Sequence, residues 1–458
     1  MPETQKKHVA VLPFPFGTHA APLLSIVRRL SSSSSAPAIF SFFCTPNTNA
    51  SLFGSSLPLG DVTPYEVWDG VSPGYTFSGK HQEDIELFIQ AAPYSFAEGM
   101  RAAEAKTGRK ITCIISDAFL WFAADMARDL DVPWLAFWTA GPAALTAHLH
   151  TDLLREKLLG DRGVVGREDE TLGFIPGMSK TSVRDLQEGV VFGNMESKFS
   201  KMLHEMGKAL PRATAVFINC FEELDPIITA DLKSKLKEYL NIGPINMMGT
   251  QVEATVPDKT GCLEWLDGQR EASVVYVSFG TVMVPPAKEL EELAGALEES
   301  GAPFIWSLKE KVWGSLPVGF LERTEGRGKV VGWAPQVGIL RHPSVGAFVT
   351  HCGWNSVLES IVGGRAPMIC RPFFGDQRLN ARMMEVVWGM GAGMEGGVIS
   401  KKRLLSCLGE IGLVSDGGGK GREMRDNLLS LRRRAQSSVS TDGTSSANFR
   451  SLLTLALS

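Results

Sequence analysis

The sequence has few of the features that mark disulfide-bonded, metal-binding or membrane proteins. Its 458 residues include only seven cysteines, an odd number, and no two of them form a CxxC pair. We therefore expect neither a disulfide framework nor a zinc site, and no metal. No apolar run approaches the ~20 residues of a membrane helix. The first apolar run follows Lys6 and Lys7, but Pro13 and Pro15 interrupt it, so we expect no signal peptide. We expect a cytoplasmic location instead.

The sequence also lacks a strong charge of either sign. Its 46 Lys and Arg residues nearly balance 50 Asp and Glu residues, which gives a formal net charge of -4. Without a basic field, we expect no nucleic-acid partner and no membrane insertion. Hydrophobic residues make up 44% of the chain and charged residues 21%, as in ordinary globular proteins. A monomer of two domains with small-molecule ligands is expected.

Short apolar runs alternate with helical patterns along the chain. This alternation predicts an α/β fold with parallel sheets in two doubly wound domains, and a ligand cleft at the carboxyl ends of the strands. We expect an N-terminal domain over 1–240, a linker over 241–262, a C-terminal domain over 263–440, and a last helix over 441–458 that packs back on the first domain. The predicted strands are His8–Phe14, Ile39–Cys44, Ile111–Ser116, Val132–Trp138, Val216–Asn219, Ser273–Phe279, Phe304–Leu308, Lys329–Trp333, Val345–Thr350 and Pro367–Cys370.

The most informative window is 333–377. Within it the strand Val345–Thr350 runs into His351-Cys352-Gly353-Trp354-Asn355-Ser356 and then into a helix. Free backbone N–H groups at the helix start suit a diphosphate. Asn355 and Ser356 can donate to phosphate oxygens, although they are also good capping residues that need do no more than cap the helix.

Other residues of the window suit the remaining parts of a nucleotide sugar. Glu359 lies one turn beyond Asn355 and Ser356, within reach of a ribose hydroxyl pair. Trp333 can stack on a base, or it can simply fill core. Asp376 and Gln377 follow the next strand and can accept hydrogen bonds from sugar hydroxyls.

The first strand of the chain leads to a candidate general base. The segment Phe14–His19 enters a helix and places His19 at the mouth of the expected cleft, where an imidazole can take a proton near neutral pH. Asp117 closes the strand Ile111–Ser116, and neighbouring strand ends come close together in such a sheet. A carboxylate there can hold the imidazole tautomer. The residues alone leave open a structural role for His19.

Taken together, these motifs resemble the sugar-nucleotide box of the plant family 1 UDP-glycosyltransferases, and the whole chain is similar to that family. The resemblance implies the GT-B fold, with two Rossmann-like domains facing a central cleft. It also implies inverting transfer with His19 as general base oriented by Asp117, and no cofactor or metal besides the UDP-sugar. The implied donor-binding residues are Thr139, Thr281, Trp333, Ala334, Gln336, His351, Trp354, Asn355, Ser356, Glu359, Asp376 and Gln377.

Stretches at 16–22, 82–88, 138–142 and 185–189 are similar to the flavonoid 3-O-glucosyltransferases of that family. The resemblance implies glucose transfer from UDP-glucose to the 3-hydroxyl of a flavonol or anthocyanidin. UDP-galactose, another phenolic acceptor, or a non-catalytic nucleotide-sugar-binding protein are the alternatives. Gln377 resembles the residue of glucose users, since galactose users tend to have histidine there. The implied acceptor-binding residues, of which Phe14 and Phe119 could instead be core, are Phe14, Gly17, Gln82, Phe119, His148, Gln187 and Phe374.

Three local features fit less simply. The box carries one residue more than expected, at Gly364-Arg365-Ala366-Pro367, which would disturb the sugar contacts unless the loop absorbs it. A literal DxD, Asp129-Leu130-Asp131, lies between a helical run and a strand and is interpreted as a solvated turn. A literal GxGxxG, Gly391–Gly396, follows a helix instead of linking a strand to one, so it is not a dinucleotide fingerprint.

Overall fold

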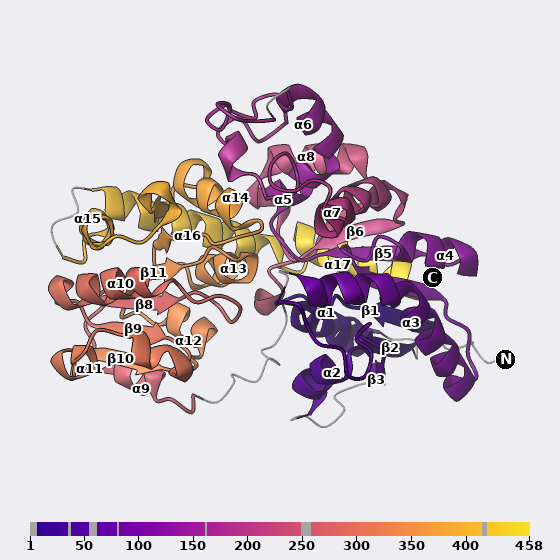
Figure 1. Ribbon diagram of the computed structural model, residues 1–458, viewed down its shortest axis with the longest axis horizontal. Helices are drawn as coiled ribbons and strands as arrows, with labels where there is room; N and C mark the ends of the chain where they lie inside the picture. Colours follow the sequence, from indigo (N-terminus) through magenta and orange to yellow (C-terminus); the bar gives the residue numbers. More distant parts are fainter. Residues whose placement is uncertain are drawn as a thin grey trace. The chain divides into compact units, whose positions relative to one another are not determined.

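The chain folds into two compact α/β units (Figure 1). The structure, a computed structural model, describes residues 7–34, 38–54, 62–79, 82–160, 163–248, 258–414 and 419–458. Unit 1 comprises Met1–Arg167, Glu188–Ile245 and Thr441–Ser458, and unit 2 comprises Glu168–Gln187 and Asn246–Ser440. Segment 168–187, assigned from the sequence to the N-terminal domain, thus belongs to unit 2. Residues 249–257 of the expected linker lie outside the described residues.

Unit 1 is built on a parallel sheet. Within the described residues its seven strands lie in the order β3-β2-β1-β4-β5-β6-β7. They are β1 (Lys7–Leu12), β2 (Ala38–Cys44), β3 (Val62–Glu66), β4 (Cys113–Asp117), β5 (Trp134–Trp138), β6 (Ala215–Ile218) and β7 (Tyr239–Asn241). The helices are α1 (Ala20–Ser33), α2 (Pro46–Phe53), α3 (Glu83–Thr107), α4 (Ala123–Leu130), α5 (Pro142–Leu149), α6 (Thr151–Leu158), α7 (Lys198–Ala209), α8 (Pro226–Lys235) and α17 (Thr444–Leu457).

Unit 2 repeats the same plan. Its six strands, counted over the described part of the chain, lie in the order β10-β9-β8-β11-β12-β13. They are β8 (Val274–Ser278), β9 (Phe304–Ser307), β10 (Gly328–Val331), β11 (Val345–Thr350), β12 (Met368–Cys370) and β13 (Gly391–Gly393). The helices are α9 (Cys262–Asp267), α10 (Ala287–Ser300), α11 (Phe320–Arg323), α12 (Gln336–Arg341), α13 (Trp354–Gly363), α14 (Gln377–Arg382), α15 (Lys401–Ile411) and α16 (Lys420–Ser438), with the short 3₁₀ helix η1 (Val183–Asp185) from the first half of the chain.

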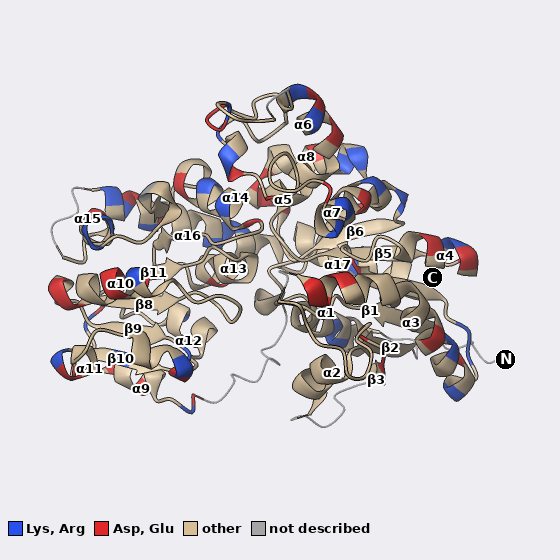
Figure 2. Ribbon diagram, in the orientation of Figure 1, with Lys and Arg blue, Asp and Glu red and all other residues tan. Residues whose placement is uncertain are grey.

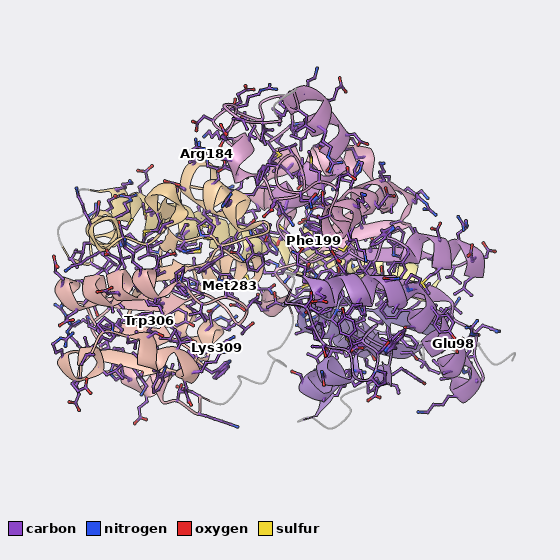
Figure 3. The ribbon with its side chains drawn as sticks, viewed as in Figure 1. Glu98, Arg184, Phe199, Met283, Trp306 and Lys309 are labelled. Atoms are coloured by element: carbon purple, nitrogen blue, oxygen red, sulfur yellow. The ribbon has the colours of Figure 1, made fainter. Side chains whose placement is uncertain are left out.

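Continuous apolar strands form the centre of each sheet because helices cover both faces. In unit 2, one face of β8, β9 and β11 packs against α10, α11 and α15, and Trp306 of β9 is completely buried there (Figure 3). On the other face Tyr276 stacks on Phe348 with 5.1 Å between ring centroids, and its hydroxyl reaches Gln336 of α12. The carboxyl ends of the strands are thereby held in a fixed register.

The strands that the sequence did not predict, β3, β7 and β13, all lie at sheet edges. β3 carries Pro64, which an edge strand tolerates because one side makes no ladder bonds. β13 is formed by Gly391–Gly393, so the GxGxxG segment does include a strand. A 3₁₀ turn at Glu395–Gly397 follows it, which is not the helix that a dinucleotide site requires.

Two distant segments complete the units. In unit 1, α17 is tied to the end of β7, where Ser445 Oγ donates to the Gly243 carbonyl oxygen at 2.6 Å and Asn448 Nδ2 donates to that of Asn241 at 3.1 Å. In unit 2, Arg382 of α14 donates from Nε to the Lys180 carbonyl oxygen at 2.8 Å. Each unit therefore depends on residues far from it in sequence.

The surplus residue Arg365 lies at the amino end of the unit 2 sheet. It follows Gly364, which ends α13 with a φ of +67°, and its Nη1 is 3.7 Å from Glu271 Oε1. Beyond the loop, β12 pairs with β11 in unbroken register from Phe348↔Met368 to Thr350↔Cys370. The extra residue therefore leaves the pairing of β12 with β11 regular, and we predict that the loop absorbs it.

Replacing Arg365 with alanine is expected to leave donor use unchanged. The change removes one solvent-exposed ion pair, which typically contributes about 0–1 kcal/mol to the free energy of unfolding. To check this, the KM for the UDP-sugar and the denaturation midpoint are measured for Arg365→Ala and for the wild type. A several-fold rise in that KM would show that the loop does influence the sugar contacts.

Charged residues of both signs are interspersed over the exposed helices of each unit (Figure 2). Arg128 of α4, for example, pairs with Asp125 on the same helix at 2.9 Å. Among the described helices, none combines the length and the apolar character needed to span a bilayer.

Candidate active site

Polar side chains gather at the same position in both units. A doubly wound sheet binds ligands at the carboxyl ends of its strands, where the strand order reverses. In unit 1 this reversal lies between β1 and β4. His19 comes after β1, and Asp117 is the last residue of β4. In unit 2 it lies between β8 and β11, and Thr281 and His351 follow those strands.

In unit 1, His19 and Asp117 are directly hydrogen-bonded. His19 Nδ1 lies 2.8 Å from Asp117 Oδ2, and Asp117 Oδ1 accepts from the Phe119 backbone N–H at 2.9 Å. Asp117 is fully buried, whereas the His19 side chain is 20% exposed. Because an ionised carboxylate only accepts, Nδ1 carries the proton and Nε2 keeps its lone pair. The geometry is that of a base held by an orienting carboxylate.

Thr139 contacts the same imidazole. Its Oγ1 lies 3.1 Å from His19 Nδ1, next to the bond to Asp117. Thr139 follows β5, the strand beside β4, so three consecutive strand ends converge on one ring. The resemblance assigned Thr139 to the donor sugar, and the contact with His19 is a further one.

Aromatic rings line the region around His19. Phe14 lies 5.2 Å from its ring centroid and Phe119 lies 4.8 Å away. This aromatic cluster extends from α3 to α5 through successive ring contacts of 5.1–6.1 Å, and comprises Phe14, Phe16, Phe88, Phe119, Trp138 and His148. Phe16 and Phe119 are partly exposed and suit a flat apolar ligand, whereas Phe14, Phe88, Trp138 and His148 are buried and form core in this structure.

The expected acceptor residues divide between the units. Gly17 and Gln82 both have left-handed backbones, with φ of +62° and +64°. The conformation is unusual for glutamine, which here precedes the first residue of α3. His148 is buried in α5. Gln187 and Phe374 belong to unit 2.

In unit 2, the turn after β11 presents an open helix start. Cys352 has a φ of +66°, Gly353 precedes the helix, and the ten-residue α13 begins at Trp354 without a side-chain cap. Asn355 and Ser356 therefore lie inside the helix, and neither caps it. The uncapped N–H groups and the helix dipole form a favourable environment for an anion.

His351 is enclosed by glycines beside this helix start. A Cβ atom on Gly353 would lie 2.4 Å from His351 Nε2, and one on Gly280 would lie 3.0 Å from it. Its Nδ1 is buried without a hydrogen-bond partner among the described residues. Burial lowers the pKa of His351 to about 4. The imidazole is therefore neutral at pH 7 and has hydrogen-bonding capacity to offer a ligand.

The low pKa of His351 predicts loss of stability in mild acid. Unfolding returns the pKa to about 6.5, so the unfolded state gains a proton first as pH falls. The contribution of the neutral His351 to the free energy of unfolding is fully present above pH 6.5. It is lost as the pH falls from 6.5 towards 4, by up to about 1.4 kcal/mol per pH unit. Denaturant unfolding at several pH values should give a shallower decline for His351→Gln than for the wild type. Parallel curves would contradict the assignment.

A second group of side chains joins α12 to α13. Gln336 Nε2 donates to Ser356 Oγ at 2.9 Å and to Glu359 Oε2 at 2.7 Å, and Gln336 Oε1 accepts from Tyr276. Three residues expected to bind the nucleotide are thus joined in one hydrogen-bonded network. Nearby in sequence, Trp333 is 45% exposed, with its ring open to solvent.

The remaining expected donor residues vary in accessibility. Ala334 is buried, and Trp354 is buried with its ring 6.4 Å from that of Trp388. Thr281 is exposed after β8, and its carbonyl oxygen accepts from Lys309 Nζ at 2.5 Å. Met283 and Lys309 mark the loops after β8 and β9 (Figure 3).

The loop after β12 holds Asp376 and Gln377 by its own hydrogen bonds. Gln377 Oε1 accepts from the backbone N–H groups of Phe373 at 2.8 Å and Phe374 at 3.2 Å. The sequence predicted that Gln377 accepts from sugar hydroxyls, but this side-chain oxygen already accepts twice, so the amide N–H groups are what Gln377 can offer a sugar. Asn380 Nδ2 donates to Asp376 Oδ2 at 2.7 Å and to the Cys352 carbonyl oxygen at 3.0 Å.

Sequence reasoning missed Asn380, Arg371 and Glu289. Arg371 and Glu289 form a buried ion pair beneath the same loop. The position of Arg371, directly after the predicted strand Pro367–Cys370, was an available signal. The sequence around Glu289 gives no sign of a role in the site, because this residue lies on a helix 82 residues away from Arg371 in sequence.

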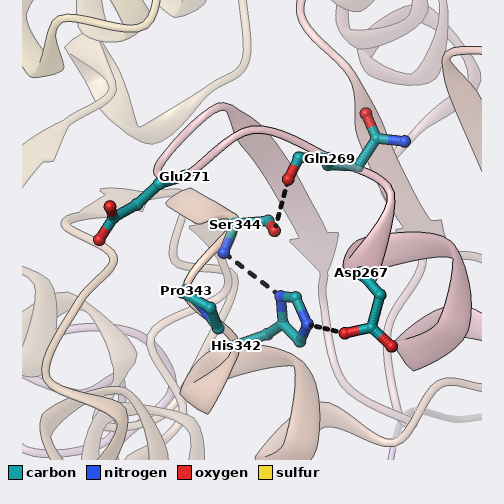
Figure 4. Close-up of a pocket in the computed structure, with 6 residues that line it drawn as sticks. All are labelled: Asp267, Gln269, Glu271, His342, Pro343 and Ser344. Atoms are coloured by element: carbon teal, nitrogen blue, oxygen red, sulfur yellow. Dashed lines mark hydrogen bonds and ion pairs between the residues drawn. The ribbon is translucent and has the colours of Figure 1, made fainter.

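A hollow of about 430 Å³ lies at the other end of the unit 2 sheet (Figure 4). His342 Nε2 is 3.1 Å from Asp267 Oδ1 there, and Ser344 N donates to His342 Nδ1 at 3.3 Å. Because these residues precede β8 and β11, the hollow is distant from the carboxyl ends of the strands. It is therefore not part of the donor site.

No group of three or more His, Cys, Asp or Glu side chains is arranged to hold a metal ion within the ranges that the structure describes. In the DxD segment, Asp129 is bonded to Arg128 at the exposed end of α4, and Asp131 follows the helix with a φ of +53°. The solvated turn predicted for the segment is therefore only Asp131, because Asp129 and Leu130 are the last two residues of α4.

The two sheets and the site at their strand ends define the GT-B class of nucleotide-sugar transferases. A solved structure described as UDP-glucose: anthocyanidin 3-O-glucosyltransferase in complex with UDP superposes with a TM-score of 0.91, at 40% identity over 99% of both chains. Residues 80–416 match the family described as UDP-glucoronosyl and UDP-glucosyl transferase, and the chain belongs to that family.

Two curated relatives match over nearly their full length. The chain is 56% identical to anthocyanidin 3-O-glucosyltransferase UFGT of Vitis vinifera, over 99% of this chain and 98% of the relative. It is 54% identical to flavonol 3-O-glucosyltransferase of Arabidopsis thaliana, over 98% and 97%.

Proposed function

We propose that this protein transfers glucose from UDP-glucose to the 3-hydroxyl of a flavonol or anthocyanidin, with inversion at the anomeric carbon. The observation that carries the proposal is the 2.8 Å hydrogen bond between His19 Nδ1 and the buried Asp117, in a chain 56% identical to an anthocyanidin 3-O-glucosyltransferase. A general base with an orienting carboxylate is what activation of a hydroxyl requires.

In the proposed reaction, His19 Nε2 takes the proton of the acceptor hydroxyl. The oxygen attacks the anomeric carbon, the bond from that carbon to the β-phosphate oxygen breaks, and UDP leaves with the electron pair. Asp117 stabilises the resulting imidazolium, and His19 then returns its proton to solvent. Positioned general bases contribute about 10²–10⁴-fold to such steps.

The donor is held by unit 2 in this proposal. The open start of α13 and the neutral His351 hold the diphosphate, with Asn355, Ser356 and Thr281 as further donors, so developing charge on UDP meets N–H groups and a helix dipole. Trp333 stacks on uracil beside Ala334, while Gln336 and Glu359 bind ribose. Asp376, Gln377, the backbone of Trp354, and Thr139 contact the sugar.

The acceptor is held mainly by the aromatic cluster of unit 1. The ring centroids of Phe14 and Phe119 lie 5.2 Å and 4.8 Å from that of His19, and His148 ends the cluster at α5. Gly17, Gln82, Gln187 and Phe374 are the further acceptor contacts proposed.

A matched pair of acceptors tests the proposal. Quercetin and luteolin differ only in the 3-hydroxyl, so product should form from quercetin and not at a comparable rate from luteolin. UDP-glucose should exceed UDP-galactose in kcat/KM, and a chelator should leave turnover unchanged. Equal product from luteolin would overturn the 3-hydroxyl assignment. Absence of UDP release with any phenolic acceptor would favour the non-catalytic binding protein. The metal-free reaction, the monomeric state and the cytosolic location stay predictions.

A further inference from the structure

A loop in unit 2 carries two of the residues proposed to contact the sugar, Asp376 and Gln377. This sugar loop, residues 371–377, leaves β12 and enters α14 at Gln377. Gly375 within it has a φ of +65°. Few of its residues lie in regular structure, so side-chain contacts must fix its shape.

The sugar loop begins on a buried ion pair. Arg371 Nε donates to Glu289 Oε2 at 2.8 Å, its Nη2 reaches Glu289 Oε1, and the two side chains are 9% and 7% exposed. Arg371 Nη1 also donates to the Pro372 carbonyl oxygen at 2.8 Å, and the guanidinium carbon lies 3.6 Å over the Phe373 ring centroid. The arginine therefore contacts the next two residues of its own loop.

Glu289 connects the sugar loop to two other segments. It lies on α10, and its Oε2 also accepts from the Ile399 backbone N–H at 2.9 Å. Burial alone would raise the pKa of Glu289, but the hydrogen bonds from Arg371 and Ile399 together with the arginine charge lower it below its ordinary value. The carboxylate is ionised and holds the loop, α10 and the segment after β13 together.

These contacts continue to the residues that face the sugar. Arg371 fixes Phe373 through ring stacking, and the Phe373 N–H bonds to Gln377 Oε1. The orientation of the Gln377 amide therefore depends, through Phe373, on the Arg371–Glu289 pair. A buried ion pair is weak support for stability, since apolar replacements of such pairs are often neutral.

We propose that Arg371 and Glu289 are positioning residues that set the discrimination between donor sugars. They hold the sugar loop so that the Asp376 carboxylate and the Gln377 amide meet the sugar hydroxyls. The proposal rests on the use of a UDP-sugar as donor and not on the identity of the acceptor.

Binding of UDP and of UDP-glucose separates this role from a structural one. UDP lacks the sugar, so titration calorimetry of Glu289→Gln and Arg371→Lys should give UDP dissociation constants within about twofold of the wild type. The preference of kcat/KM for UDP-glucose over UDP-galactose should fall by about tenfold, since a misplaced polar group loses its hydrogen bonds. The double variant Glu289→Gln/Arg371→Met removes the charge pair but keeps an acceptor for the Ile399 N–H. It should show the same unchanged UDP affinity and the same reduced sugar preference, and its melting temperature should equal that of the wild type.

The same substitution elsewhere on α10 is the control. Glu298→Gln breaks the exposed pair between Glu298 and Arg323, and should leave sugar preference unchanged. Unchanged sugar preference in the Arg371 and Glu289 variants would overturn the proposal. A parallel loss of UDP and UDP-glucose affinity would also overturn it, because it indicates general damage. Failure of the proposed function would be seen separately, as a wild-type enzyme that transfers no sugar to flavonoids.

Discussion

The His19→Ala variant is expected to lose about 10²–10⁴-fold in kcat with its UDP affinity unchanged. The variant removes the imidazole that is hydrogen-bonded to Asp117 in unit 1, whereas the residues proposed to hold UDP all belong to unit 2. Asp117→Asn should reduce kcat to a similar order, because an amide no longer enforces the tautomer with a free Nε2 lone pair. Steady-state kinetics with quercetin and UDP-glucose, beside UDP titration, measure both effects.

A second histidine–aspartate pair in unit 1 supplies the control. His204 Nε2 lies 2.6 Å from Asp152 Oδ1 on the outer helices α7 and α6. His204→Ala should keep wild-type kcat, which excludes a general effect of deleting a paired imidazole. Retention of more than a tenth of wild-type kcat by His19→Ala would remove His19 as the base.

The Gly353→Ala variant is expected to weaken UDP binding on the order of tenfold to a hundredfold. Its backbone conformation accepts any residue, with φ of -62°, but the added methyl would lie 2.4 Å from His351 Nε2. Gly280 also lies close to the ring, since a Cβ atom there would be 3.0 Å from His351 Nε2, so we expect the added methyl to displace the imidazole from the start of α13. Overpacking of this kind typically costs about 1–3 kcal/mol.

A double variant identifies the ring as the cause. If the clash with His351 is responsible, Gly353→Ala/His351→Ala should bind UDP no worse than His351→Ala alone, which is a strongly non-additive result. Gly314→Ala, where an added methyl has nothing within 4 Å, is the matched control and should bind UDP normally. Additive losses would mean that Gly353 acts independently of His351.

The centres of both sheets could be predicted from the sequence, whereas three of the four edge strands could not. β1 and β11 are buried on both faces and form continuous apolar runs, a pattern that is recognisable without tertiary information. β3, β7 and β13 each have one neighbour, and their residues include Pro64 and two glycines. The pattern that defines a strand is absent from these three strands, whereas β10, also at an edge, keeps it with Val330 and Val331.

The same distinction holds for the site. Contacts that follow from strand order were accessible, since adjacent parallel strands must bring His19 near Asp117. Contacts between a loop and a distant helix, such as that between Arg371 and Glu289, could not be predicted, because no periodicity in the sequence relates the two positions. The sequence could locate Gln377 after the predicted strand Pro367–Cys370, but nothing in it indicates that the side-chain oxygen accepts from the Phe373 and Phe374 N–H groups.

The position of α17 has a consequence for synthesis on the ribosome. Unit 1 begins with β1, yet its edge at β7 is completed by Ser445 and Asn448, which are translated after all of unit 2. At rates of about 5–20 residues per second, the apolar surface that α17 covers remains uncovered for roughly ten seconds or more after β7 has emerged. The first unit therefore becomes complete only after the second has been made.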